Sequence, residues 1–311
     1  MSTFPPPRQS LADYLALRRT LGFKLHATGR LLGQFVDWLE EHGALTPTID
    51  HALTWANLPE NASRPWRAIR LRAVRGFAIY LHSLDPGVAV PPANLVCPGP
   101  DRATPYLYSQ QQITDLIAAA GCLLPRLRAA TYQTLIGLLA VAGLRVGEAI
   151  RLDNGDLDID HGLLTIRETK FGKTRQLPLH PTTVAALSAY VSLRYRTRPH
   201  PICPALLVST TGTRLQQSNI NLTFQRLTQA AGITRRSATC RPRPHDLRHG
   251  YAVATVLDWY RAGFDVETMM PYLATYLGHT DPKHTYWYLS AAPELMALAG
   301  QRLETHLEGR A

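Results

Sequence analysis

Cysteine is scarce in this chain of 311 residues, and its few occurrences do not cluster. The cysteines form no CxxC pair and stand beside no group of histidines at metal-ligand spacing. This distribution excludes a disulfide framework and a zinc site built from Cys and His. We therefore expect a protein of a reducing compartment. The four cysteines are Cys97, Cys122, Cys203 and Cys240.

Long apolar runs are missing as well. No stretch reaches the roughly 18 apolar residues that a membrane-spanning helix needs. The first residues, MSTFPPPRQSLADY, lack the apolar core of a signal peptide, and the chain carries no lipidation signature. We expect a cytoplasmic protein without a membrane partner.

Acidic residues are outnumbered, with 23 Asp and Glu against 33 Lys and Arg, which gives a formal net charge of +10. This surplus favours a polyanionic partner, with nucleic acid as the first candidate and an anionic membrane surface as the alternative. The length allows two domains, and the 45% of hydrophobic residues allows each of them a core.

The hydrophobic spacing predicts a helical N-terminal domain over residues 1–84. Apolar residues recur at helical period in four stretches, and Ser10, Gly43 and Ser63 supply start and stop signals. The fourth stretch carries a run of arginines, which is either a solvated face or a surface for DNA phosphates. The candidate DNA contacts in this run are Arg67, Arg70 and Arg75.

Residues 85–106 are predicted to be a linker, because five prolines between positions 86 and 100 stiffen a stretch without periodicity. The second domain then covers residues 107–311. Three short strands are expected at 157–159, 163–167 and 176–179, separated by turns at His161-Gly162 and Phe171-Gly172. The rest of this domain has helical periodicity, so the predicted fold is mainly α with a small three-stranded β-sheet.

Four stretches of the second domain place cations beside Gly or Pro. Arg145 follows Gly143 and can present its planar guanidinium to two phosphate oxygens, although Glu148 also offers it an intrahelical ion pair. Lys170 lies on a predicted hairpin turn, where a lysine is either solvent-exposed or able to protonate a departing sugar oxygen. Lys173 and Arg175 of the same hairpin are expected to touch backbone phosphates.

A predicted helix that begins at Pro244 carries His245 and Arg248 on one face. Arg241 and Arg243 precede it, and the start of the helix adds a partial positive charge. This combination favours an anion-binding role over a purely structural one.

The last stretch contains His279, Tyr286 and Tyr288. The tyrosines are two residues apart, so they cannot share a helix face. A tyrosine acts as a nucleophile only after it loses its proton, and cations around a bound phosphate favour the phenolate. From the residue pattern alone, either Tyr286 or Tyr288 could be the nucleophile, and each could equally be a packing residue.

In their order along the chain, these motifs resemble the tyrosine recombinase (phage integrase) family over about residues 109–296. Residues 1–84 are similar in size and position to the core-binding domain of that family. The interval from Arg248 to His279 looks longer than the corresponding interval in compact members of the family. The matching motifs are Arg145, Lys170, His245-Asp-Leu-Arg248, Leu-Gly-His279 and Tyr288.

The resemblance implies a mechanism. Arg145 and Arg248 would clamp the non-bridging oxygens of the scissile phosphate, and His245 and His279 would hydrogen-bond it and assist proton transfer. Lys170 would be the general acid for the 5′ hydroxyl. Glu148 would support the pocket. Tyr288 would be the nucleophile that forms a 3′-phosphotyrosyl intermediate, and Tyr286 is the second choice for this role. No metal or cofactor is implied.

The resemblance also implies partners. We expect double-stranded DNA with specific recombination sites, a homotetramer on synapsed DNA that resolves a Holliday junction, and room for accessory recombinases. The tail after Met296 would dock on a neighbouring protomer or fold back on its own domain. A nucleoid-associated recombinase of a mobile genetic element is the first hypothesis, with a type IB topoisomerase or a non-catalytic DNA-binding paralogue as alternatives.

Overall fold

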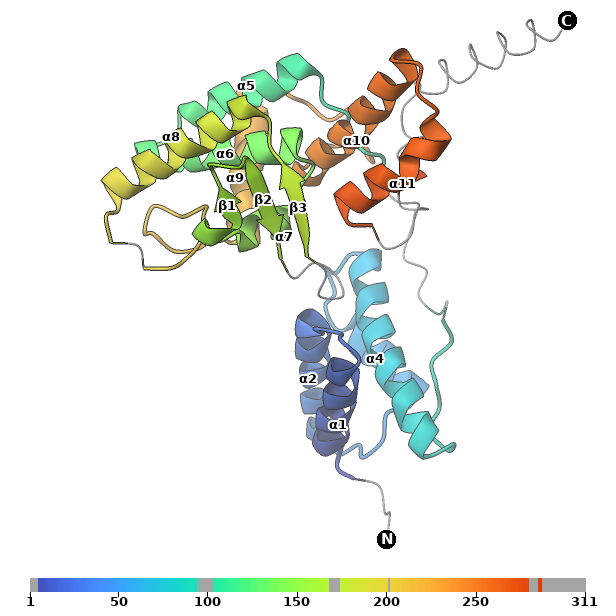
Figure 1. The fold of residues 1–311 in the computed structure, drawn as a ribbon. Helices are drawn as coiled ribbons and strands as arrows, with labels where there is room; N and C mark the ends of the chain where they lie inside the picture. Colours follow the sequence, from blue (N-terminus) through green and yellow to red (C-terminus); the bar gives the residue numbers. More distant parts are fainter. Residues whose placement is uncertain are drawn as a thin grey trace, which may run out of the picture. The chain divides into compact units, whose positions relative to one another are not determined.

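The structure is a computed structural model, and it describes residues 5–93, 95, 103–167, 174–200, 202–279 and 285–286. The backbone contacts divide the chain into two compact units, residues 1–102 and 103–311 (Figure 1). The division into a domain of residues 1–84, a linker of residues 85–106 and a domain of residues 107–311 stays a prediction.

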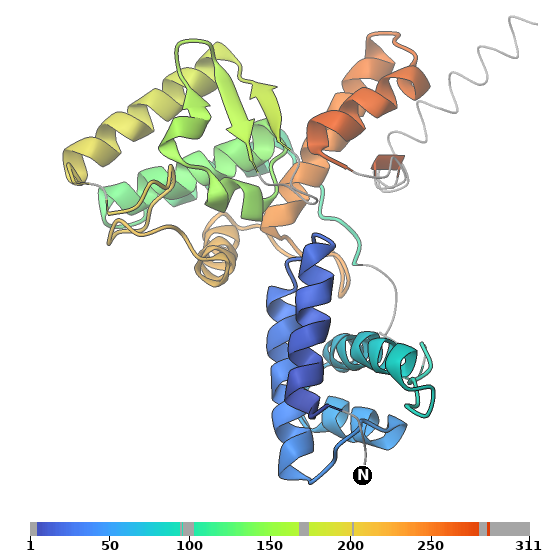
Figure 2. The same cartoon turned by 60° about the horizontal axis from the view of Figure 1, so that its bottom comes forward.

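The N-terminal unit is a helical bundle of α1 (Pro7–Thr20), α2 (His26–Glu41), α3 (Ile49–Asn57) and α4 (Arg64–Leu84) (Figure 2). Thr48 caps α3, because its side chain accepts a hydrogen bond from the backbone N–H of His51 at 3.1 Å. Phe35 and Phe77 are fully buried where α2 and α4 pack together, and each is worth about 2 kcal/mol of hydrophobic stabilisation.

The prediction that Arg70 contacts DNA is wrong, because its side chain belongs to the core of this unit. Its guanidinium lies 3.5 Å from the ring centroid of Trp55, and Nη2 donates a 2.7 Å hydrogen bond to the Trp55 carbonyl oxygen. Only 7% of the residue is exposed, and this burial lowers the pKa of its guanidinium. Helical period alone could not separate an arginine that stacks on an indole from one that faces solvent.

We expect Arg70→Ala to destabilise the chain by about 2–3 kcal/mol, since it removes a buried cation–π contact and the shorter of the two hydrogen bonds that the Trp55 carbonyl oxygen accepts. Chemical denaturation of the full chain measures this. Arg72→Ala is the matched control, because Arg72 is exposed on the same helix and its loss costs less than about 0.5 kcal/mol. Equal effects of the two substitutions would contradict a core role for Arg70.

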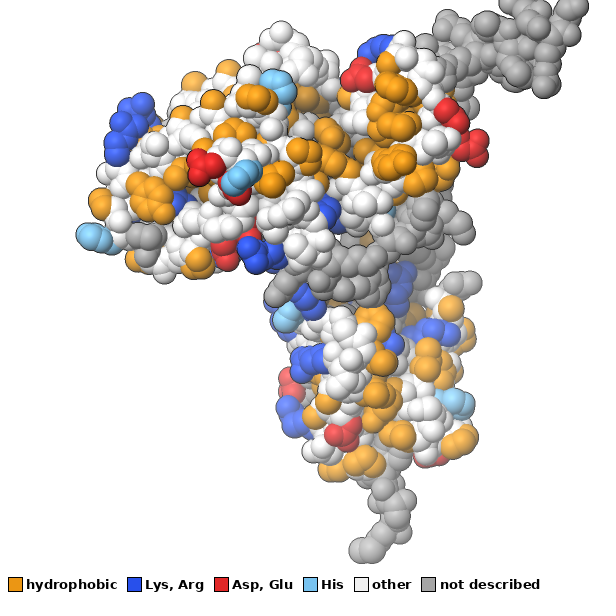
Figure 3. All heavy atoms as spheres, viewed as in Figure 1, with side chains coloured by type: hydrophobic (Ala, Val, Ile, Leu, Met, Phe, Trp, Pro, Cys, Tyr) orange, Lys and Arg blue, Asp and Glu red, His pale blue; other side chains and the backbone are white. Residues whose placement is uncertain are grey.

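Arg67 and Arg75 are partly exposed, so their predicted contacts with DNA stay predictions. Arg67 donates to the carbonyl oxygen of Glu60 and Arg75 to that of Pro91, both at 2.9 Å. Basic side chains are spread over the face of this unit that Figure 3 shows.

The second unit surrounds the long helix α6 (Arg126–Val141), which packs against α5 (Gln110–Gly121), α8 (Pro181–Thr197) and α10 (Pro244–Arg261). The predicted fold class, mainly α with one small sheet, is confirmed. The sheet has the antiparallel order β1-β2-β3, with Leu164 opposite Leu157 on one side and Leu177 on the other. Its strands are β1 (Leu157–Asp158), β2 (Leu163–Ile166) and β3 (Arg175–Pro178).

The remaining helices of this unit are α7 (Val146–Arg151), the 3₁₀ turn Asn154–Asp156, α9 (Gln217–Ala230) and α11 (Val266–Leu277). The long interval that follows Arg248 is the rest of α10 together with α11. These two helices share a small apolar core that includes Val256, Met270 and Leu277. Figure 3 shows further hydrophobic side chains on the surface over both helices. None of the helices in the described ranges is long and apolar enough to cross a membrane.

Candidate active site

Arg145 stands at the junction between α6 and α7, where the chain changes direction at Gly143. Gly143 has a φ of +58°, and a Cβ there would lie 2.6 Å from the ring of Tyr251, so only glycine fits this turn. The Arg145 guanidinium donates to Oε1 of Glu148 at 2.7 Å and to the carbonyl oxygen of Gly278 at 3.1 Å. A third of the side chain stays exposed, so the group is fixed in place but accessible.

Arg248 lies on the second turn of α10 and is fully buried. Its Nη1 donates to the carbonyl oxygen of Gly143 at 2.7 Å, and its Nη2 donates to that of Leu277 at 2.6 Å. The same Nη2 lies 3.0 Å from Nε2 of His279. One guanidinium therefore connects the α6–α7 junction, the end of α11 and the histidine that follows it.

Glu148 is the carboxylate of this cluster, and only 3% of it is exposed. It accepts a hydrogen bond from the backbone N–H of Arg145 at 3.0 Å and lies 3.9 Å from Nη1 of Arg248. Burial by itself raises the pKa of Glu148, but the hydrogen bonds and charges of Arg175 and Arg145 outweigh it and hold the pKa at about 2. Glu148 is therefore ionised at neutral pH, as its predicted supporting role requires.

The prediction that Arg175 touches DNA phosphates is wrong. The side chain, which begins β3, is only 12% exposed, and it donates to both oxygens of Glu148, at 3.2 and 2.9 Å. A Cβ on Gly278 would lie 2.8 Å from its Nη1, so the glycine makes room for this guanidinium. Local sequence cannot distinguish a solvent-facing arginine from one that turns inward at this position, because the partner carboxylate lies 27 residues away.

His279 follows the end of α11, where Gly278 adopts the left-handed conformation with a φ of +67°. Its Nδ1 lies 2.7 Å from the hydroxyl oxygen of Thr285, which is fully buried. Sequence reasoning did not identify Thr285, because a single threonine between charged and aromatic residues carries no distinctive signal. The structure thus brings together Arg145, Arg248 and His279, which belong to three separate motifs of the sequence.

His245 occupies the first turn of α10 and is exposed. It lines a hollow of about 930 Å³ together with Arg241, Arg243 and one face of α9. Arg243 also binds Asp246, with Nη2 2.8 Å from Oδ1, and the Asp246 carboxylate accepts a hydrogen bond from the backbone N–H of Arg243 at 3.1 Å, which closes the start of α10. Arg241 is exposed beside it.

Lys170, Lys173, Tyr288 and the tail after Met296 lie outside the described residues. Tyr286 is described, and 43% of it is exposed. The predicted roles of all these residues therefore stay predictions. Within the described ranges, no group of three or more His, Cys, Asp or Glu side chains could hold a metal ion.

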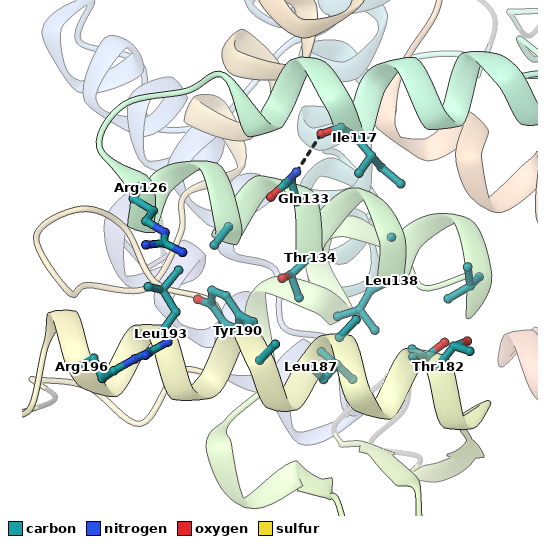
Figure 4. A pocket seen from close by; sticks show the side chains of 16 residues that line it. Ile117, Arg126, Gln133, Thr134, Leu138, Thr182, Leu187, Tyr190, Leu193 and Arg196 are labelled. Atoms are coloured by element: carbon teal, nitrogen blue, oxygen red, sulfur yellow. Dashed lines mark hydrogen bonds between the residues drawn. The ribbon is translucent and has the colours of Figure 1, made fainter.

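A separate hollow of about 490 Å³ lies between α6 and α8 (Figure 4). Leu138, Leu187 and Leu193 line it, with Arg126 and Arg196 near its rim. None of the predicted site residues lines this hollow, so we do not assign the active site to it.

Comparison with known proteins agrees with this geometry. Residues 108–294 match the model of the phage integrase family. The chain is 43% identical to a putative integrase/recombinase, y4rB, of Sinorhizobium fredii, in an alignment of 319 positions that covers 100% of both chains. It is 29% identical to the tyrosine recombinase XerD of Neisseria meningitidis, covering 88% of this chain and 89% of that protein.

Among solved structures, the fold is similar to the Tn1549 transposon integrase in complex with transposon right end DNA, with a TM-score of 0.63 and 17% identity. That match covers 95% of this chain and 99% of the other. Since the family model covers more than half of the chain and y4rB aligns with all of it, the chain belongs to the phage integrase family of tyrosine recombinases, enzymes that cut and rejoin DNA strands.

Proposed function

We propose that this chain is a site-specific recombinase that exchanges DNA strands through a 3′-phosphotyrosyl intermediate and serves a mobile genetic element. The observation that carries the proposal is the charge of the buried cluster. Three guanidinium groups, Arg145, Arg175 and Arg248, surround one carboxylate, Glu148, which leaves a surplus of two positive charges. A phosphodiester carries one negative charge and gains a second when an oxyanion attacks it, so the cluster stabilises the transition state more than the ground state.

In the proposed reaction, Tyr288 loses its phenol proton with the assistance of the pocket histidines, its oxygen attacks the scissile phosphorus, and the bond to the 5′ oxygen breaks. Lys170 gives a proton to that oxygen, which otherwise leaves as a poor alkoxide. Arg145 and Arg248 hold the non-bridging oxygens, and His245 and His279 hydrogen-bond the phosphate. A 5′ hydroxyl from another strand then gives its proton back to Lys170 and attacks the phosphotyrosine, and Tyr288 leaves and regains its phenol proton. The covalent bond conserves the energy of the broken one.

The hollow beside the cluster suits the duplex that this reaction needs. Its lining contains amide side chains one turn apart on α9, namely Gln217, Asn221 and Gln225, and no Asp or Glu among the described residues. Cations next to it attract phosphates, and amides are tolerated close to DNA because they carry no charge. We propose duplex DNA with specific sites as partner, a homotetramer on two synapsed sites, and a cytoplasmic location on the nucleoid.

Arg241→Gln is expected to weaken binding to duplex DNA of any sequence, because an exposed arginine in this lining contacts phosphates. The slope of log K against log salt concentration should become shallower by about 0.9. Titration of a fluorescent duplex at several salt concentrations measures this. Arg261→Gln, at the exposed far end of α10, is the control that keeps the wild-type slope. An unchanged slope in Arg241→Gln would place this side chain in solvent.

The proposed function is tested with plasmids that carry one or two copies of the DNA that flanks the gene. A recombinase exchanges strands between two matching sites and leaves a one-site plasmid unrecombined. Relaxation of supercoils without any site requirement would instead make the chain a type IB topoisomerase. Binding without covalent chemistry on either plasmid would indicate a non-catalytic DNA-binding protein.

A further inference from the structure

Helix α9 presents a row of amide side chains to the hollow of about 930 Å³ that also borders His245. Gln217, Asn221 and Gln225 follow one another at intervals of four residues, and all three are exposed and line this hollow. Residues four apart lie above one another on a helix. The three amides therefore form one ridge, which we call the amide stripe.

Another face of α9 anchors the helix in the core of its unit. The hydroxyl oxygen of Thr223, which is buried, accepts a hydrogen bond from Arg128 of α6 at 3.2 Å. The hydroxyl of Tyr132, also on α6, donates to the carbonyl oxygen of Asn219 at 3.3 Å. These contacts and the packed apolar side chains give the amide stripe a rigid support. The buried apolar side chains of α9 are Ile220, Phe224 and Leu227.

The protein itself does not use the amide groups of the stripe. Within the described ranges, none of the three side chains makes a hydrogen bond. A helix face that meets only water usually carries charged side chains, but α9 has a single charged residue, Arg226. Asparagine is also among the poorer helix formers, so helix stability does not account for Asn221. The stripe thus has donors and acceptors available for a ligand.

The chemistry of an amide selects one kind of base. Its NH₂ group donates to N7 of adenine while its carbonyl oxygen accepts from the N6 amino group, so the two groups pair through two hydrogen bonds. These atoms lie at the edge of an A·T pair in the major groove, which is wide enough for an α-helix. Guanine is read mainly by Arg or Lys and cytosine by Asp or Glu, and the stripe contains none of these.

The dimensions and the surroundings of the stripe also suit a duplex. From Gln217 to Gln225 the helix rises about 12 Å, which spans roughly three to four base-pair steps of about 3.4 Å. Val146, next to Arg145, and His245 line the same hollow, so the stripe lies close to the predicted catalytic residues. Two exposed cations in the lining can bind the adjoining phosphates, namely Arg235 and Arg241.

We propose that the amide stripe reads adenine bases in the major groove and so selects recombination sites that carry A·T pairs a few base pairs from the scissile phosphate. The proposal rests on the proposed function for the presence of duplex DNA in this hollow. The three amides recognise bases and touch no reacting atom, so they determine specificity and do not take part in the chemistry.

Base preference is measured by selection from duplexes that are randomised over one binding site, with the full chain and sequencing of the bound fraction. We expect adenine to be enriched about tenfold at the positions that face the stripe. Asn221→Ala should lose this preference at one position and keep it at the others. Asn219→Ala is the matched control, because Asn219 is exposed on the same helix but lines a different hollow, and it should keep the wild-type preferences.

Asn221→Arg gives a result that a loss of structure cannot produce. Arginine pairs with O6 and N7 of guanine, so the preference at the same position should change from adenine to guanine by about tenfold. In Asn221→Ala, the slope of log K against log salt concentration should stay at the wild-type value, because an uncharged amide releases no counterion. A changed slope would place Asn221 on a phosphate and overturn base reading.

The outcomes separate this proposal from the proposed function. A wild-type chain without adenine preference, an Asn221→Ala variant with unchanged preferences, or an equal loss in Asn219→Ala would overturn the amide stripe. Strand exchange on two-site plasmids is scored independently. Its absence, together with an adenine preference that changes to guanine in Asn221→Arg, would refute the recombinase and leave the stripe as the base reader of a DNA-binding protein.

Discussion

Tyr288→Phe is expected to abolish the covalent protein–DNA adduct and strand exchange, lowering both rates by more than about 10⁴-fold. Phenylalanine keeps the ring but has no oxygen to attack phosphorus, and no second group in the proposed mechanism replaces it. Binding to duplex DNA should stay close to wild type, because one hydroxyl adds little to an affinity that depends on phosphate contacts. The adduct is measured by denaturing electrophoresis after trapping on a nicked duplex.

Tyr286→Phe is the matched control for that experiment. Tyr286 lies two residues before Tyr288 and is 43% exposed, so it loses its hydroxyl without a cavity in the core. We expect it to form the adduct at a rate within a few-fold of wild type. An adduct that persists in Tyr288→Phe and disappears in Tyr286→Phe would reverse the assignment of the nucleophile.

Glu148→Gln is expected to have the second largest effect, on both stability and rate. The amide leaves Arg145 and Arg175 without a counter-charge in a buried site, which costs on the order of 3 kcal/mol. The two guanidiniums and the Gly278 loop then lose their fixed geometry. A misplacement of about 1 Å lowers the rate of adduct formation by roughly a hundredfold.

The pH dependence of the unfolding free energy distinguishes the contribution of the negative charge of Glu148 from that of its side-chain shape. Since the folded-state pKa of about 2 lies below the unfolded value of 4.5, the ionised carboxylate stabilises the fold above pH 4.5. This stabilisation, about 3 kcal/mol, is lost as the pH falls from 4.5 toward 2. The difference in unfolding free energy between wild type and Glu148→Gln should therefore shrink over that range, as urea denaturation would show.

Asp156→Asn is the matched control for the loss of activity. Asp156 is also a buried carboxylate paired with an arginine, Arg167, but it supports the 3₁₀ turn before β1 and no predicted catalytic residue. We expect it to lower stability while the folded fraction forms the adduct at the wild-type rate. Equal losses of activity in the two variants would mean that Glu148 contributes only to the fold.

Much of this protein can be predicted from sequence because the relevant signals are local. Helical period and capping residues predicted the mainly helical fold, and turns at Gly162 and Gly172 predicted a three-stranded sheet close to the observed strands. Arg145, Arg248 and His279 were selected because cations and glycines stood at distinctive spacings, and the supporting role of Glu148 was implied by the resemblance to the recombinase family. Their gathering into one cluster agrees with that selection, while their catalytic roles stay predictions.

Other assignments depended on partners far away in the chain. Arg70 and Arg175 have the composition of surface arginines, yet one stacks on Trp55 and the other pairs with Glu148. A guanidinium is planar and polarisable as well as charged, so an indole face or a buried carboxylate suits it as well as a phosphate does. Which of these partners it meets depends on how helices and strands pack, and no local pattern encodes that.

The sequence by itself determined the family, the order of the catalytic motifs and the positive charge that suits DNA, since each depends on residue type and spacing. Only the tertiary structure decided which cations surround Glu148 and which hydroxyl lies against the ring of His279. The reason is physical. Hydrogen bonds and buried ion pairs act over about 3 Å, and only folding brings residues 133 or 105 positions apart within that distance, as between Arg145 and Gly278 or Arg248 and Gly143.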